Sequence, residues 1–186
     1  SLGVASFKSK APGTKATKVK PSATSAPKTS IKAKAQVRRF WIEARTLTGG
    51  SRNQLDLSMA GVHKRIAGSL ALFGVNGTNT STVTSLLIRY KGVDYFDNHI
   101  LYPITAAGKS NKTWRMQLNG TSTAGQSLTQ FCATDFPNKT LIFRQLGPNH
   151  YLVTAVSTSK QLGKLQSLSK LWDQNKGGNG RFFGEL

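Results

Sequence analysis

Forked hydrogen-bond donors gather in the segment GGSRNQ, residues 49–54. The segment follows a strand-like run, RRFWIEA at residues 38–44, and precedes an apolar alternation. In a DNA major groove, arginine bonds guanine and asparagine or glutamine bonds adenine through two parallel contacts. Glycine, serine and asparagine alone would indicate a plain connecting turn. The arginine and glutamine beside them favour base readout instead.

A second donor-rich segment, GKSNKTWRMQLNG, covers residues 108–120. Two such edges on one domain predict a two-sided grip, in which basic and hydroxyl groups hold phosphates and forked groups read bases. The contacts predicted in the first segment and just before it are Arg45, Thr48, Ser51, Arg52, Asn53 and Gln54. Those predicted in the second are Lys109, Ser110, Asn111, Lys112, Thr113, Arg115 and Gln117. Trp41 and Trp114 lie in strand patterns, which favours core positions over base stacking.

Acidic and nucleophilic residues form no catalytic pattern. The seven acids are scattered, and the closest pair, Asp94 and Asp97, has the character of turn residues more than of metal ligands. The chain contains no G-x-S-x-G elbow, no P-loop and no G-x-G-x-x-G fingerprint. A Ser/His/Asp triad stays open, because its members need not be neighbours in sequence. We expect a protein that binds and does not catalyse, without cofactor or metal.

Positive charge points to a polyanionic partner. The chain has 26 Lys plus Arg against seven Asp plus Glu, a formal charge of +19, with a pI near 10.6. Residues 1–37 hold eight lysines and no acid. The remaining 18 basic and seven acidic residues give residues 38–186 a formal charge of +11. The basic character therefore belongs to the main part of the chain as well as to the leading segment.

Residues 1–37 are rich in Lys, Ala, Thr, Ser and Pro, a composition too poor in large apolar groups to form a core. They predict a disordered basic arm or linker. The first residue is Ser, so we expect a piece of a longer chain, with a processed or tagged protein as the alternative. The roughly 150 residues that follow are enough for one domain, residues 38–186.

No apolar stretch is long enough to cross a bilayer, so no membrane partner is expected. Cys132 is the only cysteine, which excludes a disulfide framework and a zinc site of cysteines. A buried small apolar residue is the interpretation that its surroundings favour. A reducing cytoplasmic location fits this cysteine content.

Short runs of β-branched and aromatic residues, separated by turn signals such as Asn76-Gly77 and Lys91-Gly92, predict a mainly β open barrel or sandwich. The expected strands are residues 38–44, 68–75, 83–90, 93–97, 100–104, 113–118, 127–136, 139–146 and 150–156. One or two short helices are expected. Residues 57–68 are the weaker candidate and residues 159–175 the stronger, with an apolar stripe from Leu162 to Trp172 and Ser159 as the cap.

The succession FWIEARTLTGGSRNQLDLS, SLALFG, LIRYKGVDYFDNHILYPI and KSNKTWRMQL resembles the B3-like DNA-recognition domain of NgoFVII/NgoAVII-type restriction endonucleases. The resemblance covers about residues 38–156. It implies a DNA-binding pseudobarrel whose N-arm and C-arm enter the major groove. It places Arg45 and residues 51–54 in the N-arm and residues 109–117 in the C-arm. It also implies a bacterial protein with a separate phospholipase-D-like nuclease domain in the same parent chain.

Three functions follow as hypotheses. The first is sequence-specific recognition of double-stranded DNA with a guanine-containing site, by the target-recognition domain of a type II restriction endonuclease. The second is non-specific binding of single-stranded nucleic acid or RNA by a β-barrel with a basic arm. That function requires exposed aromatic side chains, for which Tyr90, Tyr95, Phe96 and Tyr102 are the candidates, although their alternation with apolar neighbours favours burial. The third is a nuclease in its own right.

Overall fold

The computed structural model describes residues 37–50, 52–58, 72–75, 84–101, 108, 113–174 and 180–186. All of them belong to one compact unit, Ala35–Leu186. The predicted basic arm lies outside the described residues except for Val37. Residues 59–68 of the weaker helix candidate and residues 68–71 and 102–104 of the expected strands also lie outside them.

Nine strands and two helices make up the described part of the chain. The strands are β1 (Arg39–Glu43), β2 (Gln54–Ser58), β3 (Thr84–Tyr90), β4 (Val93–Leu101), β5 (Trp114–Gln117), β6 (Lys139–Gly147), β7 (His150–Ser157), β8 (Leu171–Gln174) and β9 (Phe182–Glu185). The helices are α3 (Thr129–Thr134) and α4 (Thr158–Leu168).

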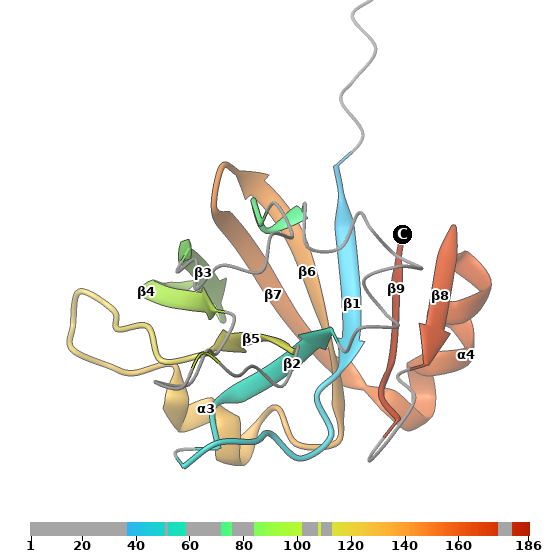
Figure 1. Ribbon diagram of the computed structural model, residues 1–186, viewed down its shortest axis with the longest axis horizontal. Coiled ribbons are helices and arrows are strands. Elements are labelled where there is room, and N and C mark those ends of the chain that lie inside the picture. Colours follow the sequence, from blue (N-terminus) through green and yellow to red (C-terminus); the bar gives the residue numbers. More distant parts are fainter. Residues whose placement is uncertain are drawn as a thin grey trace, which may run out of the picture. The chain divides into compact units, whose positions relative to one another are not determined.

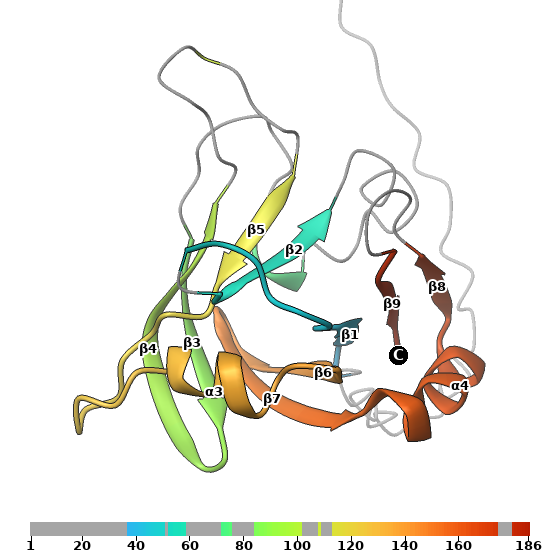
Figure 2. The same ribbon diagram turned by 90° about the horizontal axis from the view of Figure 1, so that it is seen from below.

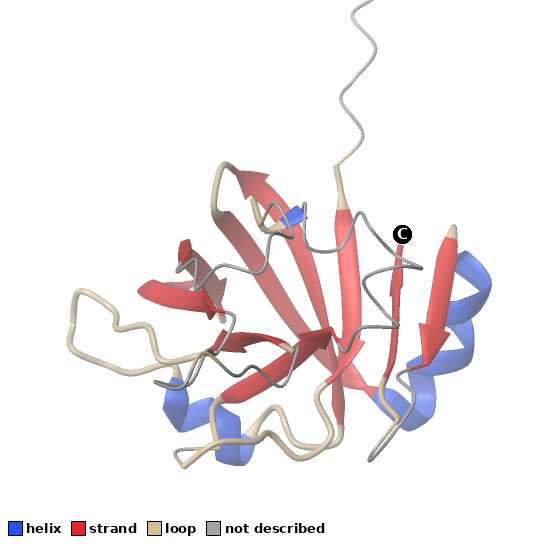
Figure 3. Cartoon of the chain, in the orientation of Figure 1, coloured by secondary structure: helices blue, strands red, loops and turns tan. Residues whose placement is uncertain are grey.

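The described strands form a single sheet in the order β2-β5-β4-β3-β7-β6-β1-β9-β8 (Figure 1). Neighbouring strands run antiparallel, except that β3 and β7 are parallel. The sheet curls, so that β2 at one end of the order comes close to β1 and β9 (Figure 2). Together with the two short helices (Figure 3), this confirms the predicted mainly β open barrel.

Aromatic rings fill the inside of the curled sheet. Phe73 packs edge-on against Phe40 and Phe143, with ring centroids 5.9 and 5.4 Å away, and lies 5.1 Å from the ring of Tyr151. The Tyr151 hydroxyl donates to the Leu72 carbonyl at 2.5 Å, and burial raises the pKa of Tyr151 to about 12. This hydrogen bond attaches the short segment 72–75 to β7. It also gives a partner to the Tyr151 hydroxyl, the one polar side-chain atom among these four rings.

Asn98 joins β4 to the chain that follows β5. Its side chain is fully buried, donates to the Tyr95 carbonyl at 2.9 Å and accepts from the Gly120 amide at 2.9 Å. The neighbouring Asp97 has a φ of 61°, where β4 bulges away from β3. A buried carboxamide with its groups satisfied stabilises this irregular backbone, which would otherwise leave polar groups unpaired.

Trp41 packs on the other side of β1, between the sheet and the C-terminal elements. It is fully buried, and its indole N–H donates to the Ser169 hydroxyl at 2.7 Å. A Cβ on Gly184 of β9 would lie 2.8 Å from the Trp41 ring, so glycine allows the close approach of the strand. Trp114 is 3% exposed. The prediction that both tryptophans are core residues is confirmed.

Several predicted elements differ from those observed. Residues 127–136 were expected to form a strand, but they contain α3. Leu128 and Cys132 are both buried and lie four residues apart, which matches a helical turn and not the alternation of a strand. The expected strand 93–97 and residues 100–101 of the expected strand 100–104 belong to one strand, β4, which pairs with β3 on both sides of the bulge. In residues 72–75, Leu72 is helical and Phe73 and Gly74 form a turn, so this segment is not the end of a strand.

The stronger predicted helix, residues 159–175, is shorter than expected. α4 ends at Leu168, where the Ser169 hydroxyl donates to the Leu165 carbonyl at 2.7 Å and the backbone turns extended. The chain then forms β8 along β9, so Leu171 and Trp172 do not extend the helical stripe and are exposed. Ser159 lies in the first turn, and Ser157 occupies the N-cap position. β2 and β9 were not expected.

Replacing Gly120 with alanine should destabilise the fold, because the new Cβ would overlap the Asn98 amide and the Phe96 carbonyl. We expect a loss of about 1 to 3 kcal/mol in the free energy of unfolding, measured by urea denaturation. Gly163→Ala is the matched control, since Gly163 lies in α4 with open space around its Cα. That variant should gain about 0.5 to 1 kcal/mol from helix propensity. Equal stability changes in both variants would contradict this packing.

Cys132 should be chemically inert in the folded protein. It is 2% exposed, and burial raises the pKa of its thiol to about 12, so almost no thiolate forms near neutral pH. We expect no modification by a thiol reagent at pH 8 over the time in which urea-unfolded protein reacts completely. Rapid labelling of the native protein would show that the helix α3 opens readily.

Candidate nucleic-acid interface

The first donor segment forms a tight hairpin between β1 and β2. The backbones of Thr48 and Gln54 exchange two hydrogen bonds of 3.0 Å, and the Arg52 amide donates to the Gly49 carbonyl at 3.0 Å. Gly49 has a φ of +87°, and a Cβ there would lie 2.7 Å from the Gln54 side chain. Glycine is therefore required both for the turn and for contact with Gln54. The turn leaves Arg52 exposed at its tip.

This hairpin docks on β5, which carries the second donor segment. The Leu118 amide donates to the Asn53 carbonyl at 2.9 Å, and Gln54 lies directly opposite Gln117 in the β2–β5 ladder. Side chains directly opposite each other in an antiparallel ladder have Cβ atoms about 4.5 to 5.5 Å apart. The structure thus brings together residues from the two segments that the sequence singles out.

Side chains along β2 and β5 alternate between the core and the opposite face of the sheet. Leu55 and Met116 face each other and are fully buried in the core. Gln54, Asp56, Arg115 and Gln117 lie on the opposite face and are partly exposed. His99 of β4 pairs with Gln117 and continues the row of polar side chains across three strands. We call Gln54, Gln117 and His99, with the adjacent Arg52 and Asn53, the polar row.

Four predicted contact residues keep their side chains available for a ligand. Arg52 is exposed, whereas Asn53, Gln54 and Gln117 are half-buried. The Arg52 guanidinium and the three carboxamides form no ion pair and no hydrogen bond with any described residue. Their donors and acceptors would therefore bond to water or to a bound partner.

Other predicted contact residues are already engaged. The Arg45 guanidinium lies 3.2 Å from the buried Glu43 carboxylate, and Arg115 Nε lies 3.3 Å from Asp56 Oδ1. The Thr48 hydroxyl donates to the Gln54 carbonyl at 3.4 Å, and Thr113 is 6% exposed. Ser51, Lys109, Ser110, Asn111 and Lys112 lie outside the described residues.

The two donor segments leave the β2–β5 pair at opposite ends. The hairpin before β2 adjoins Gln54 and Gln117, whereas the connection from β4 enters β5 at Trp114, opposite Ser58. Gln117 and Trp114 are three residue steps apart along β5, which corresponds to about 10 Å at about 3.3 Å per residue. The polar row and Trp114, the first strand residue of the second segment, therefore lie at the two ends of one short ladder.

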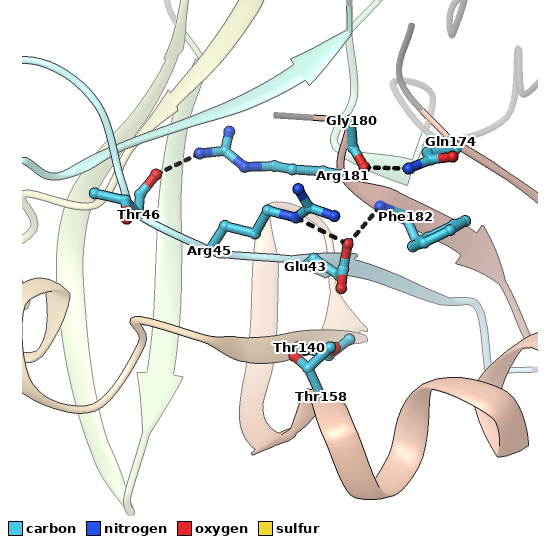
Figure 4. Close-up of polar contacts among 9 residues, drawn as sticks. All are labelled: Glu43, Arg45, Thr46, Thr140, Thr158, Gln174, Gly180, Arg181 and Phe182. Atoms are coloured by element: carbon cyan, nitrogen blue, oxygen red, sulfur yellow. Dashed lines mark hydrogen bonds and ion pairs between the residues drawn. The ribbon is translucent and has the colours of Figure 1, made fainter. Parts of the chain in front are cut away.

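Arg181 is a functional candidate that the sequence did not reveal. It is 6% exposed, donates through Nη2 to the Thr46 carbonyl at 2.6 Å, and has Nη1 3.6 Å from Asp56 Oδ2. Burial lowers the pKa of Arg181, an effect that the nearby Asp56 opposes. Figure 4 shows its side chain reaching across from the start of β9 to Thr46, beside the pair formed by Arg45 and Glu43. No local pattern could have identified this contact, because 135 residues separate the two partners.

Acidic residues in the described ranges form no metal site. Asp94 is held by Arg89 through two contacts of 2.7 Å, which keep the pKa of that carboxyl below its usual range. Asp97 accepts from the Ser85 hydroxyl at 3.0 Å. Within those ranges no three His, Cys, Asp or Glu side chains gather as metal ligands would. None of the described helices has the length and apolar character that crossing a bilayer requires.

Comparison with known proteins identifies no relative. No protein-family model matches the sequence, and no curated protein matches it significantly.

Proposed function

We propose that residues 38–186 form a B3-like domain that recognises a specific, guanine-containing site in double-stranded DNA. In this proposal the domain is the target-recognition part of a bacterial type II restriction endonuclease and acts in the cytoplasm. It binds DNA without a cofactor and does not cleave it. Cleavage belongs to a nuclease domain elsewhere in the parent chain.

The polar row carries this proposal. Gln54 and Gln117 lie opposite each other, and the exposed Arg52 is two residues before Gln54. Two carboxamides and a guanidinium, with no hydrogen-bonding partner among the described residues, offer the paired donors and acceptors that base edges in a major groove require. A surface that served only solubility would not need planar, forked groups side by side.

Charge supports an anionic partner. The formal charge of +11 on residues 38–186 attracts the phosphates of any nucleic acid, independently of sequence. Such attraction provides affinity and orientation, whereas the forked groups provide discrimination between bases. The lysines of residues 1–37 would add phosphate contacts, which raise affinity but do not discriminate between bases.

The spacing of the two donor segments suits a duplex. They leave the β2–β5 ladder about 10 Å apart, by the rise of about 3.3 Å per strand residue. The major groove of B-form DNA is about 12 Å wide and admits a two-stranded ribbon. Two loops at this separation would contact both sides of one groove, with the polar face of β2 and β5 between them.

Single-stranded binding has less support. That function requires neighbouring exposed aromatic rings on which successive bases stack. Tyr90 and Tyr95 are 5% and 1% exposed, and Tyr102 lies outside the described residues. The exposed rings in the described part of the chain are Phe96 on β4 and Trp172 on β8, which are far apart in the strand order. They do not form a continuous stacking surface.

Selection from a randomised duplex library should yield one short consensus. We expect the wild-type chain to prefer that duplex over scrambled duplex by at least about 1000-fold at moderate salt. Arg52→Ala and Gln117→Ala should each weaken binding to the consensus by about 1 to 3 kcal/mol and relax one base position. Binding to scrambled duplex should weaken only slightly in Arg52→Ala, through the loss of one positive charge, and should not change in Gln117→Ala.

Arg144→Ala is the matched control for Arg52→Ala. Arg144 is also exposed but lies on β6, distant from β2 in the strand order, and its loss removes the same charge. This variant should weaken consensus and scrambled duplex equally. If Arg52→Ala behaved in the same way as Arg144→Ala, the polar row would not read sequence.

The chain should leave DNA intact in the presence of magnesium or manganese. The described residues provide no carboxylate cluster for a catalytic metal. Incubation of consensus duplex with the purified chain, followed by gel analysis, should show only uncut DNA. Cleavage that follows the selected consensus would instead identify the chain as a nuclease.

A further inference from the structure

Asp56 lies between two arginines on the polar face of the sheet. Its Oδ1 is 3.3 Å from Arg115 Nε on β5, and its Oδ2 is 3.6 Å from Arg181 Nη1 beside β9. The Asp56 side chain is 27% exposed, that of Arg115 is 28% exposed, and that of Arg181 is 7% exposed. One carboxylate therefore connects a deeply buried arginine with a partly exposed one.

A carboxylate at this position is unexpected if the face only attracts phosphates. Negative charge within a polyanion-binding surface weakens the attraction for every nucleic acid. It is compatible with a binding face when its position fixes a neighbouring donor. The contact between Asp56 and Arg115 has that character, because it joins residues directly opposite each other in the β2–β5 ladder.

The ion pair with Asp56 restrains the Arg115 guanidinium. Arg115 Nε and Asp56 Oδ1 are both buried and lie 3.3 Å apart, as an ion pair in which neither atom has a hydrogen-bond partner among the described residues. Nε is buried although the side chain is 28% exposed, so we expect the terminal amino groups to face a ligand. An arginine fixed in this way presents two parallel N–H groups, the arrangement that bonds the O6 and N7 acceptors of guanine.

Arg181 in turn fixes Asp56. The Arg181 guanidinium is anchored by the Thr46 carbonyl at 2.6 Å, within the loop that leads to the polar row. Removing the partner of a buried charge destabilises a protein, so the 3.6 Å ion pair with Arg181 should restrain Asp56. The resulting chain of contacts runs from Thr46 through Arg181 and Asp56 to Arg115.

We propose that Asp56 is a positioning residue that holds Arg115 for a guanine contact while Arg181 holds Asp56. The inference rests on the proposed recognition of duplex DNA. Asp56 itself does not touch DNA and acts through Arg115. Its removal should therefore reduce discrimination even though it makes the binding face more positive.

The isosteric variant Asp56→Asn distinguishes loss of Arg115 positioning from loss of a negative charge that repels phosphate. We expect binding to the selected consensus duplex to fall about tenfold, which corresponds to about 1.4 kcal/mol. Binding to scrambled duplex should rise a few-fold, because one negative charge is lost. If both duplexes bound more tightly by the same factor, Asp56 would act only by repelling phosphate and the proposal would be wrong.

Asp94→Asn is the matched control. Asp94 has a similar exposure, 29%, and is also paired with an arginine, Arg89, but lies where β4 begins after its turn from β3. This substitution should change the affinities for both duplexes by one common factor. A selective loss on the consensus duplex in this variant as well would overturn the assignment to Asp56.

A double-mutant cycle tests whether Asp56 acts through Arg115. Arg115→Lys keeps the charge but loses the planar fork, so it should weaken consensus binding about tenfold on its own. Adding Asp56→Asn to that variant should cost nothing further on the consensus duplex. A second tenfold loss would show that Asp56 acts by another route.

Nuclear magnetic resonance of the free protein tests, without DNA, whether Asp56 restrains the Arg115 guanidinium. The Nε–H signal of Arg115 should exchange with water more slowly than that of the exposed Arg52, and Asp56→Asn should abolish the difference. Equal exchange of the two signals in the wild type would refute the restraint of Arg115 by Asp56, even if Asp56→Asn failed to fold. A wild-type chain without a preferred duplex would refute the DNA role, whereas slow exchange that Asp56→Asn abolishes would still establish the contact.

Discussion

The buried Arg181 guanidinium links the two ends of the curled sheet, because it joins the start of β9 to the loop after β1 and to β2. Arg181 precedes β9, yet it contacts the Thr46 carbonyl in the loop after β1 and the Asp56 carboxylate on the edge strand β2. An unpaired charge in this position would cost several kcal/mol, so the guanidinium keeps its partners in place. The loop that carries Arg52 and the polar face of β2 are both positioned by this contact, and the proposed interface depends on it.

Alternation along short strands provides the second constraint. On β2 and β5, leucine and methionine enter the core while carboxamides and charged groups lie on the other face. A shift of one residue in the β2–β5 register would exchange these two sets, so packing of Leu55 against Met116 fixes the position of Gln54 opposite Gln117. The hydrophobic core thereby determines which polar groups a ligand would meet. Stability and recognition are coupled through one ladder.

Local patterns predict much of this fold but not its closure. Composition and strand periodicity predict the mainly β open barrel, the buried tryptophans and the buried Cys132. The six-residue helix α3 was assigned to a strand because its aromatic and β-branched residues resemble one, and only burial of Leu128 with Cys132 distinguishes the two. The pairing of β2 with β5 and the contact of Arg181 with Thr46 join distant segments, and a single sequence carries no signal of either.

Titration of isotope-labelled protein with the selected duplex, followed by nuclear magnetic resonance, tests the account most directly. The side-chain amide signals of Gln54 and Gln117 are the informative ones, because these residues come from different segments and meet only in the folded ladder. We predict that both shift together with the Nε–H signal of Arg52 when duplex is added, and that single strands of the same length leave them unchanged. Shifts concentrated at Phe96 and Trp172, with single strands as the better ligand, would contradict recognition of a duplex by the polar row.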